Sequence, residues 1–125
     1  MIASVVTYGA AKLMVLPADG PSLGSEAAAL DLIGAAYGLE VDVIAVPVTR
    51  LGDDFFKLRT GVAGAFIQKI RNYQYRLAVV GDISRQVSAS KPLHDFVDEC
   101  NRRKDVLFVP NLEALAERLQ GPRGI

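Results

Sequence analysis

Three short, mainly apolar runs, at residues 41–46, 77–80 and 106–109, alternate along this chain with stretches of helical periodicity. Such a run between polar segments is typical of a β-strand that is covered on both faces. Strands that alternate with helices are joined by right-handed crossovers, which bring the strands together in parallel. The chain is therefore predicted to fold as an α/β protein with a mainly parallel sheet.

The N-terminal part predicts two further strands. Residues 2–8 are rich in β-branched side chains, and a second apolar run at residues 12–16 follows a short Gly9-Ala10-Ala11 link. The short link favours a hairpin, so the first strand is expected to be an antiparallel edge strand. Ser22 or Ser25 can cap a helix that runs to about residue 37, Pro92 suits the first turn of a helix that ends near residue 104, and Asn111 can cap a last helix to residue 119. With a further helix at residues 60–73, the prediction is a single five-stranded domain over residues 1–125. The tail at residues 123–125 is expected to fray.

Length and composition limit the classes of function. A chain of 125 residues with 50% apolar and 22% charged residues fits one globular domain. The 14 basic and 14 acidic residues cancel, which removes the broad attraction that nucleic-acid binding relies on. We therefore expect no binding to nucleic acid. The chain has a single cysteine, lacks a basic secretory start and contains no long apolar run, so we also expect a cytoplasmic protein that does not bind a membrane.

The helix predicted at residues 60–73 has one apolar face and two glycines near its start. Thr60 is the expected N-cap, since its hydroxyl can accept a hydrogen bond from a free amide of the first turn. Gly61 and Gly64 each cost the helix up to about 1 kcal/mol relative to alanine, so we expect another segment to approach this backbone closely. The predicted apolar face comprises Val62, Ala63, Phe66, Ile67, Ile70 and Tyr73.

The start of this helix is also a candidate anion or phosphate site. Its free amides and the positive end of the helix dipole lie beside Lys57 and Arg59 in the sequence. The alternative is that Thr60 is only a cap and that the glycines only let two elements pack, because every helix needs a cap and few bind anions.

Polar residues gather where the predicted parallel strands end, which is where parallel sheets bind ligands. They are Thr49 and Arg50, the helix start at Arg59-Thr60-Gly61, Asp82 with Ser84, and Asn111. Asp82 is the strongest carboxylate candidate, because a strand end fixes its position. Its alternative role is to close a turn. The stretch at residues 81–90 is predicted to be a loop.

The remaining reactive side chains, His94 and Cys100, give no signal of a metal or cofactor site, and we expect neither. His94 and Asp98 share a helix face and could supply two metal ligands, but no third is signalled, so a solvated ion-pair face is expected. Cys100 lies on an apolar stripe, where cysteine behaves as a small hydrophobe. No phosphate-loop, dinucleotide or zinc-helix motif is present.

The central segment resembles a bacterial family of domains of unknown function, DUF4180, whose members share the pattern D-F-F-x-L-x-T-G-x-A-G-x-x-x-Q-K. The matching residues run from Asp54 through Gly64 to Gln68-Lys69 and continue with Asn72-Tyr73 and the strand Leu77-Ala78-Val79-Val80-Gly81-Asp82. The family implies no activity for this chain.

More distantly, the order of elements and the Thr60-Gly61-Val62 helix start are similar to the STAS fold of anti-sigma-factor antagonists and sulfate-transporter tails. In those domains a partner kinase phosphorylates a serine or threonine at this helix start and so switches partner binding. The resemblance implies this role for Thr60, although Leu58-Arg59-Thr60-Gly61 stands here in place of the usual D-S-S-G.

Two classes of function follow. The first is a non-catalytic STAS-like module that binds a kinase or another regulatory protein through Thr60, Arg59, Gly61 and Gly64. The second is a small-anion binder or an enzyme that uses Arg50, Asp82 and Ser84 with the helix start. Against an enzyme, the sequence shows no general base with an orienting partner. Self-association as a homodimer is a third hypothesis.

Overall fold

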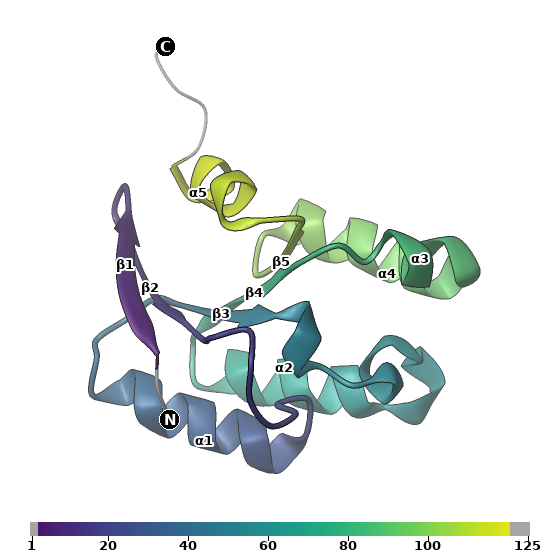
Figure 1. Ribbon diagram of the computed structural model, residues 1–125, viewed down its shortest axis with the longest axis horizontal. Helices are drawn as coiled ribbons and strands as arrows, with labels where there is room; N and C mark the ends of the chain where they lie inside the picture. Colours follow the sequence, from purple (N-terminus) through teal and green to yellow (C-terminus); the bar gives the residue numbers. More distant parts are fainter. Residues whose placement is uncertain (1–2, 121–125) are drawn as a thin grey trace.

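The computed structural model describes residues 3–120, and these form an α/β fold with a five-stranded sheet and four main helices (Figure 1). The strands are β1 (Ser4–Tyr8), β2 (Ala11–Val15), β3 (Val43–Pro47), β4 (Arg76–Val80) and β5 (Val106–Val109). The main helices are α1 (Glu26–Tyr37), α2 (Val62–Asn72), α4 (Lys91–Arg103) and α5 (Leu112–Gln120). The predicted fold class is confirmed, and the expected fraying of residues 123–125 lies outside the described residues.

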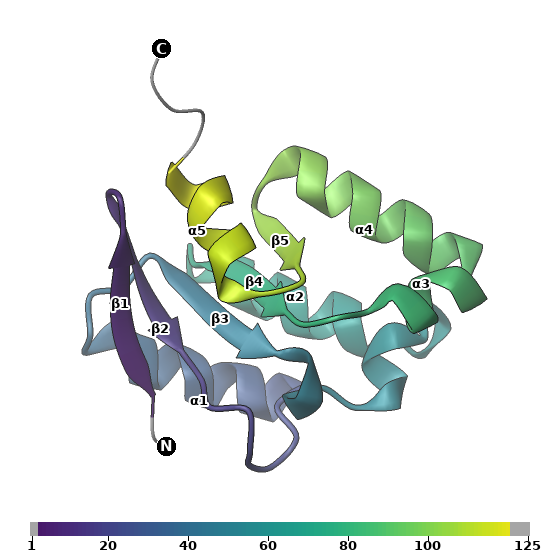
Figure 2. The ribbon, with the colours of Figure 1, turned by 45° about the horizontal axis from the view of Figure 1, so that its top comes forward.

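The strands lie in the order β1-β2-β3-β4-β5 (Figure 2). β1 pairs with β2 as an antiparallel hairpin in which Tyr8 is opposite Ala11, and every other pair is parallel. Because each crossover moves one strand in the same direction, right-handed connections place their helices on the same face of the sheet. The order of the strands therefore divides the helices unequally between the two faces.

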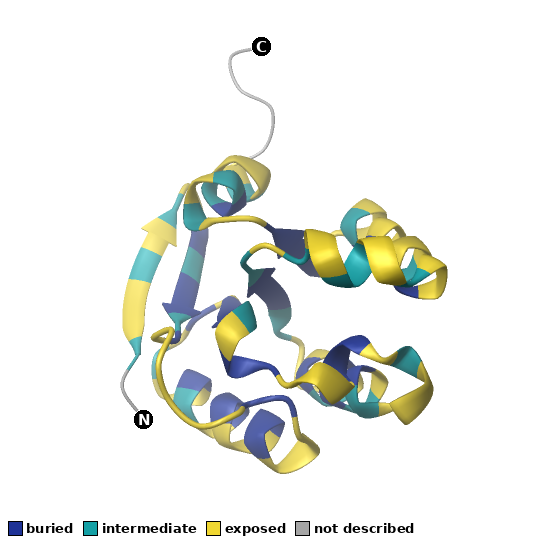
Figure 3. Ribbon diagram, turned by 45° about the vertical axis from the view of Figure 1, so that its right-hand side comes forward, coloured by how far each residue is buried: buried dark blue, intermediate teal, exposed yellow. Residues whose placement is uncertain are grey.

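Alternate residues of each parallel strand enter two separate hydrophobic clusters. In β4, Leu77 and Val79 join the cluster that contains buried residues of α1, α2 and α4, whereas Ala78 joins a second cluster with Leu115 of α5. This alternation follows from the two-residue period of a strand. Figure 3 shows the inner strands in dark blue between helices whose outward faces are yellow.

The start of α2 differs from the prediction. The helix begins at Val62, and Gly61 occupies the N-cap position with a left-handed backbone at φ 77°. A Cβ at Gly61 or Gly64 would meet nothing within 4 Å, so the expected close approach of another segment is wrong. Gly61 is explained by its backbone conformation. Tyr73 is 55% exposed, because it lies just beyond the last turn of the buried face.

The sequence suggested that residues 81–90 form a loop, and this prediction is only partly correct. These residues contain the short helix α3 (Ser84–Ala89). Val87 of α3 and Ile83, which precedes the helix, pack against the larger cluster, and the Val87 amide donates to the Ile83 carbonyl. A helix of this length has little intrinsic stability, so α3 depends on this tertiary packing. The sequence pattern did not reveal the packing, and the helix was therefore not predicted.

The segment between β3 and α2 forms three short 3-10 helices rather than an open loop. They are η1 (Val48–Arg50), η2 (Asp53–Phe56) and η3 (Leu58–Thr60). Phe55 and Phe56 are buried, and the Phe55 ring lies 5.2 Å from that of Phe56 and 5.7 Å from that of Phe66, edge to face. The two phenylalanines of the D-F-F pattern therefore anchor this segment to α2.

Within residues 3–120, no helix combines the length and the apolar character needed to cross a bilayer.

Candidate functional site

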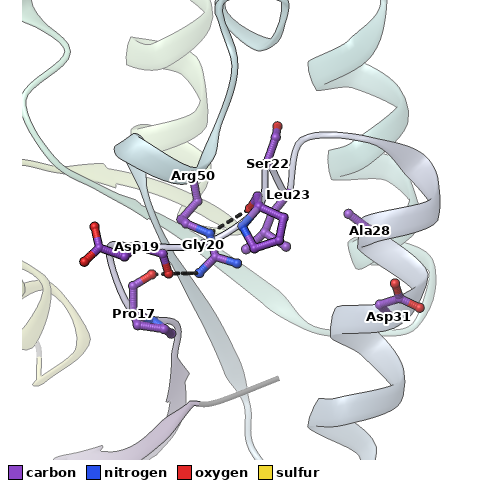
Figure 4. A pocket seen from close by; sticks show the side chains of 9 residues that line it. Pro17, Asp19, Gly20, Ser22, Leu23, Ala28, Asp31 and Arg50 are labelled. Carbon is purple, nitrogen blue, oxygen red and sulfur yellow. Dashed lines mark hydrogen bonds between the residues drawn. The ribbon is translucent and has the colours of Figure 1, made fainter.

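Arg50 is a buried, charged residue that lies just beyond the carboxyl end of β3. It ends η1, directly after β3, and only 5% of it is exposed. Its Nε donates to the carbonyl of Pro21 at 2.8 Å, and its Nη1 donates to the carbonyls of Pro17 at 2.8 Å and Asp19 at 3.2 Å (Figure 4). The guanidinium therefore fastens the loop that follows β2 onto the end of β3.

The loop after β2 is shaped to receive this side chain. Gly20 has φ +142°, and a Cβ there would lie 2.6 Å from Cζ of Arg50. No larger residue fits this close approach without displacing the guanidinium. Thr49 adds a further link, because its hydroxyl donates to the carbonyl of Ala18 at 2.8 Å.

A pocket of about 500 Å³ opens between this loop and the N-terminal half of α1. Its wall combines the Arg50 side chain with mostly apolar neighbours, and two carboxylates stand at exposed positions beside it. The volume is that of an ordinary small-molecule site. The lining residues are Pro17, Asp19, Gly20, Pro21, Ser22, Leu23, Ala28, Asp31 and Arg50.

Thr60 closes the corner between η3 and α2. Its hydroxyl oxygen accepts from the amide of Val62 at 3.2 Å and lies 2.8 Å from the carbonyls of Asp54 and Lys57, to which the hydroxyl can donate. The predicted bond to a first-turn amide is thus present, although Gly61 rather than Thr60 is the N-cap residue. The threonine side chain itself remains exposed.

Two exposed cations flank Thr60. Neither Lys57 nor Arg59 forms an ion pair with another residue of the described chain. Both line a groove of about 440 Å³ that separates the η2–η3 segment from the start of α4. The other groove residues are Phe56, Leu58, Ala89, Ser90 and Pro92. Positive charge therefore gathers on one side of this groove, and no ion pair of the described chain involves it.

Asp82 closes a turn, which is its alternative predicted role. Its Oδ1 accepts from the amide of Ser84 at 2.9 Å and so ties down the first residue of α3. The backbone hydrogen bond from Ser84, the Ser84 hydroxyl and the charge of Arg85 hold the pKa of Asp82 below its ordinary value of 3.8. Asp82 is exposed, and with Ser84 it lines a shallow pocket of about 330 Å³.

The predicted site residues do not share one pocket. Arg50 faces the loop after β2, Arg59 lines the groove beside α4, and Asp82 with Ser84 lies beside Arg85 and Gln86. The end of a strand fixes the position of a residue's backbone but not the direction of its side chain. The sequence therefore predicted that these residues lie at the same edge of the sheet, but it could not predict that they line different pockets. The residues that join Arg50 were missed, although the Pro17-Ala18-Asp19-Gly20-Pro21 run after a strand was a signal of a rigid turn.

His94 lies on an exposed helix face, whereas Cys100 is buried. His94 Nδ1 lies 3.4 Å from Asp95 and 3.7 Å from Asp98 on an exposed helix face. Among residues 3–120, no group of three potential metal ligands is present. Burial, together with the nearby charge of Asp105, raises the pKa of the Cys100 thiol to about 11, so it carries little of the reactive thiolate.

The family model described as "Domain of unknown function (DUF4180)" matches residues 8–119, which is nearly the whole described chain. No curated protein and no solved structure matches it.

Proposed function

We propose that this chain, which belongs to the DUF4180 family of domains of unknown function, is a small, non-catalytic module that binds a partner protein through the start of α2. The observation that carries the proposal is the pair of exposed, unpaired cations, Lys57 and Arg59, beside the exposed Thr60. These two cations make a surface suited to an acidic or phosphorylated segment.

The groove beside these cations supports a protein partner rather than a purely ionic contact. Phe56 and Leu58 line one side, and Pro92 lines the other. Interfaces that bind stably combine an apolar centre with a charged rim. An acidic segment of a partner can therefore place apolar side chains in the groove and carboxylates against Lys57 and Arg59.

We further propose that phosphorylation of Thr60 regulates this contact, as in STAS domains. The hairpin followed by parallel strands and the helix that begins after Thr60 support a distant relationship to that fold. A phosphate would add nearly two negative charges beside Lys57 and Arg59. It would neutralise them and so release an acidic partner. A cytoplasmic, bacterial setting is part of the same proposal.

The test uses the full chain, tagged and expressed in its own host. Intact mass with peptide mapping reports phosphate on Thr60, and affinity capture compares the wild type with the double variant Lys57→Ala/Arg59→Ala and with Thr60→Glu. We expect one partner that the wild type captures and that both variants lose, because each removes positive charge or adds negative charge at the surface.

The matched control is Arg102→Ala/Arg103→Ala, which removes two exposed cations from α4 instead. It should retain the partner, which would exclude a general effect of net charge. If the wild type and all variants capture the same proteins, the α2 start is not the binding surface. An unmodified Thr60 under every growth condition would remove the regulatory part of the proposal.

The second hypothesis was a small-anion binder or enzyme whose site combines residues from several strand ends. Arg50, Arg59 and Asp82 line different pockets, so they do not form such a combined site. What remains of the hypothesis is the Arg50 pocket, which does not depend on the start of α2.

A further inference from the structure

Arg50 is the one charged side chain that is buried among residues 3–120. A buried cation is ordinarily paired with a carboxylate, because removing an isolated charge from water is costly. No carboxylate of the described chain forms an ion pair with Arg50. Only backbone carbonyls, which are dipoles and carry no net charge, accept from it.

The hydrogen bonds of Arg50 leave one nitrogen unused. Nε donates to Pro21, and Nη1 donates to Pro17 and Asp19, which accounts for three of the five N–H groups of an arginine. Nη2 has no partner in the described chain, and in Figure 4 one guanidinium nitrogen carries no dashed line. Every fully buried side-chain nitrogen of the described residues does have a partner, so Nη2 is not sealed inside the protein. Its opening is the pocket that Arg50 lines.

The surroundings of Nη2 select the chemistry of a ligand. Pro17, Leu23 and Ala28 give the pocket an apolar wall. Asp19 and Asp31 stand beside it as exposed carboxylates, so the local charge is one buried cation and two outer anions. A ligand with several negative charges would be repelled by the two carboxylates. A single carboxylate on an apolar body would satisfy Nη2 and leave the rest of the ligand against apolar side chains.

We propose that the pocket between the 17–23 loop and α1 binds a small monocarboxylate, whose carboxylate accepts hydrogen bonds from Nη2 of Arg50. This site is independent of the start of α2, since Lys57, Arg59 and Thr60 do not line it. The Pro17–Pro21 loop is held by the same guanidinium, so Arg50 both shapes the pocket and supplies its charge.

The experiment is a titration of the full, ¹⁵N-labelled chain with butyrate, followed by two-dimensional NMR. We expect saturable shifts confined to the Arg50 Nε signal and to backbone amides of residues 17–23 and 28–31. Butan-1-ol, which has the same apolar chain but no charge, should cause no saturable shift. Inorganic phosphate should bind more weakly than butyrate because of Asp19 and Asp31.

Three variants separate binding from loop stability. Arg50→Gln should raise the Kd for butyrate by about tenfold or more, since hydrogen bonds to charged groups are worth that much. Ala28→Leu fills the pocket and should also abolish the localised shifts. Asp31→Asn removes a repelling charge and should lower the Kd by about two- to fivefold. If Arg50→Gln does not fold, the other two variants decide the question.

Arg59→Gln is the matched control, because it removes an exposed cation from the other groove. It should leave the Kd for butyrate unchanged whether or not the α2 start binds a partner. Shifts that rise linearly, spread over the surface or appear equally with butanol would overturn the proposal. So would an Ala28→Leu variant that binds butyrate as the wild type does, or an Asp31→Asn variant that does not bind it more tightly.

Discussion

Gly61 and Gly64 lie three residues apart at the start of α2 but should respond oppositely to alanine. Gly64 is inside the helix, and a Cβ there would meet nothing within 4 Å. We expect Gly64→Ala to stabilise the protein by about 0.5–1 kcal/mol, because alanine loses less backbone entropy on folding. Equilibrium urea unfolding measures this change.

Gly61→Ala is the paired control. Its backbone has φ +77°, which costs an L-residue about 1–2 kcal/mol, so this variant should be destabilised although the space around it is also open. Stabilisation by both substitutions, or destabilisation by both, would contradict this account of the two glycines.

Asp82 gives a prediction about pH. Because the amide and hydroxyl of Ser84 lower its pKa in the folded protein, its contribution to stability is fully present above the unfolded value near 3.8. That contribution is lost as the pH falls through the lower, folded pKa. NMR titration of the Asp82 carboxyl carbon should show a midpoint below 3.8.

Ser84→Ala tests the cause of this shift. It removes the hydroxyl and keeps the amide donor, so the pKa of Asp82 should rise part of the way towards its ordinary value. Arg85→Gln should raise it less, because the charge of Arg85 is the smallest of the causes. A larger rise in Arg85→Gln than in Ser84→Ala would contradict this order.

At the scale of elements, β5 is an edge strand whose open side is closed by a side chain of α4. The amide of Phe108 donates to Oδ1 of Asn101 at 2.8 Å, and Nδ2 of Asn101 donates back to the Phe108 carbonyl at 3.4 Å. Asn101 thus supplies the two bonds that a further strand would make. An edge that is partly occupied in this way is a poorer template for pairing with another chain.

We expect Asn101→Ala to destabilise the protein by about 1–2 kcal/mol, because two half-buried backbone groups lose their partner. Urea unfolding measures the loss, and hydrogen exchange should locate faster exchange at the Phe108 amide. Asn72→Ala, at the exposed end of α2, should change stability by less than about 0.5 kcal/mol. An Asn101→Ala variant as stable as the wild type would show that water replaces the amide at no cost.

The elements themselves were largely predictable. Of the two predicted caps of α1, Ser25 is the one that accepts from the amide of Ala28, and Asn111 caps α5 by accepting from the amide of Ala114. Pro92 lies in the first turn of α4 as predicted. These features depend on residues three or four apart, which a sequence displays directly. α3 was missed because its support comes from residues distant in the chain.

At the scale of the whole molecule, the two faces of the sheet are unequally covered. Buried residues of α1, α2 and α4 pack on one face, whereas α5 alone supplies the helical side chains of the second cluster in the described chain. Leu115 is the fully buried residue of α5, at 0% exposed. The stability of the second face therefore depends on a single short helix.

Leu115→Ala should destabilise the protein by about 2–5 kcal/mol, through lost burial and the cavity left against β4 and β5. This is a large share of the stability of a domain of ordinary size. Thermal unfolding measures it, and Leu30→Ala, at a position of α1 that is 46% exposed, should cost far less. Equal losses in the two variants would show that α5 contributes little to the fold.

The sequence by itself determined the strands, the main helices and the mainly parallel sheet, because apolar periodicity is a local property. The tertiary structure decided which polar residues meet. Arg50 turns back to the loop after β2, which lies 29 to 33 residues earlier in the chain, and not towards Arg59 or Asp82. That choice depends on the conformation of Gly20 and on the fit between two loops, and no local pattern encodes it.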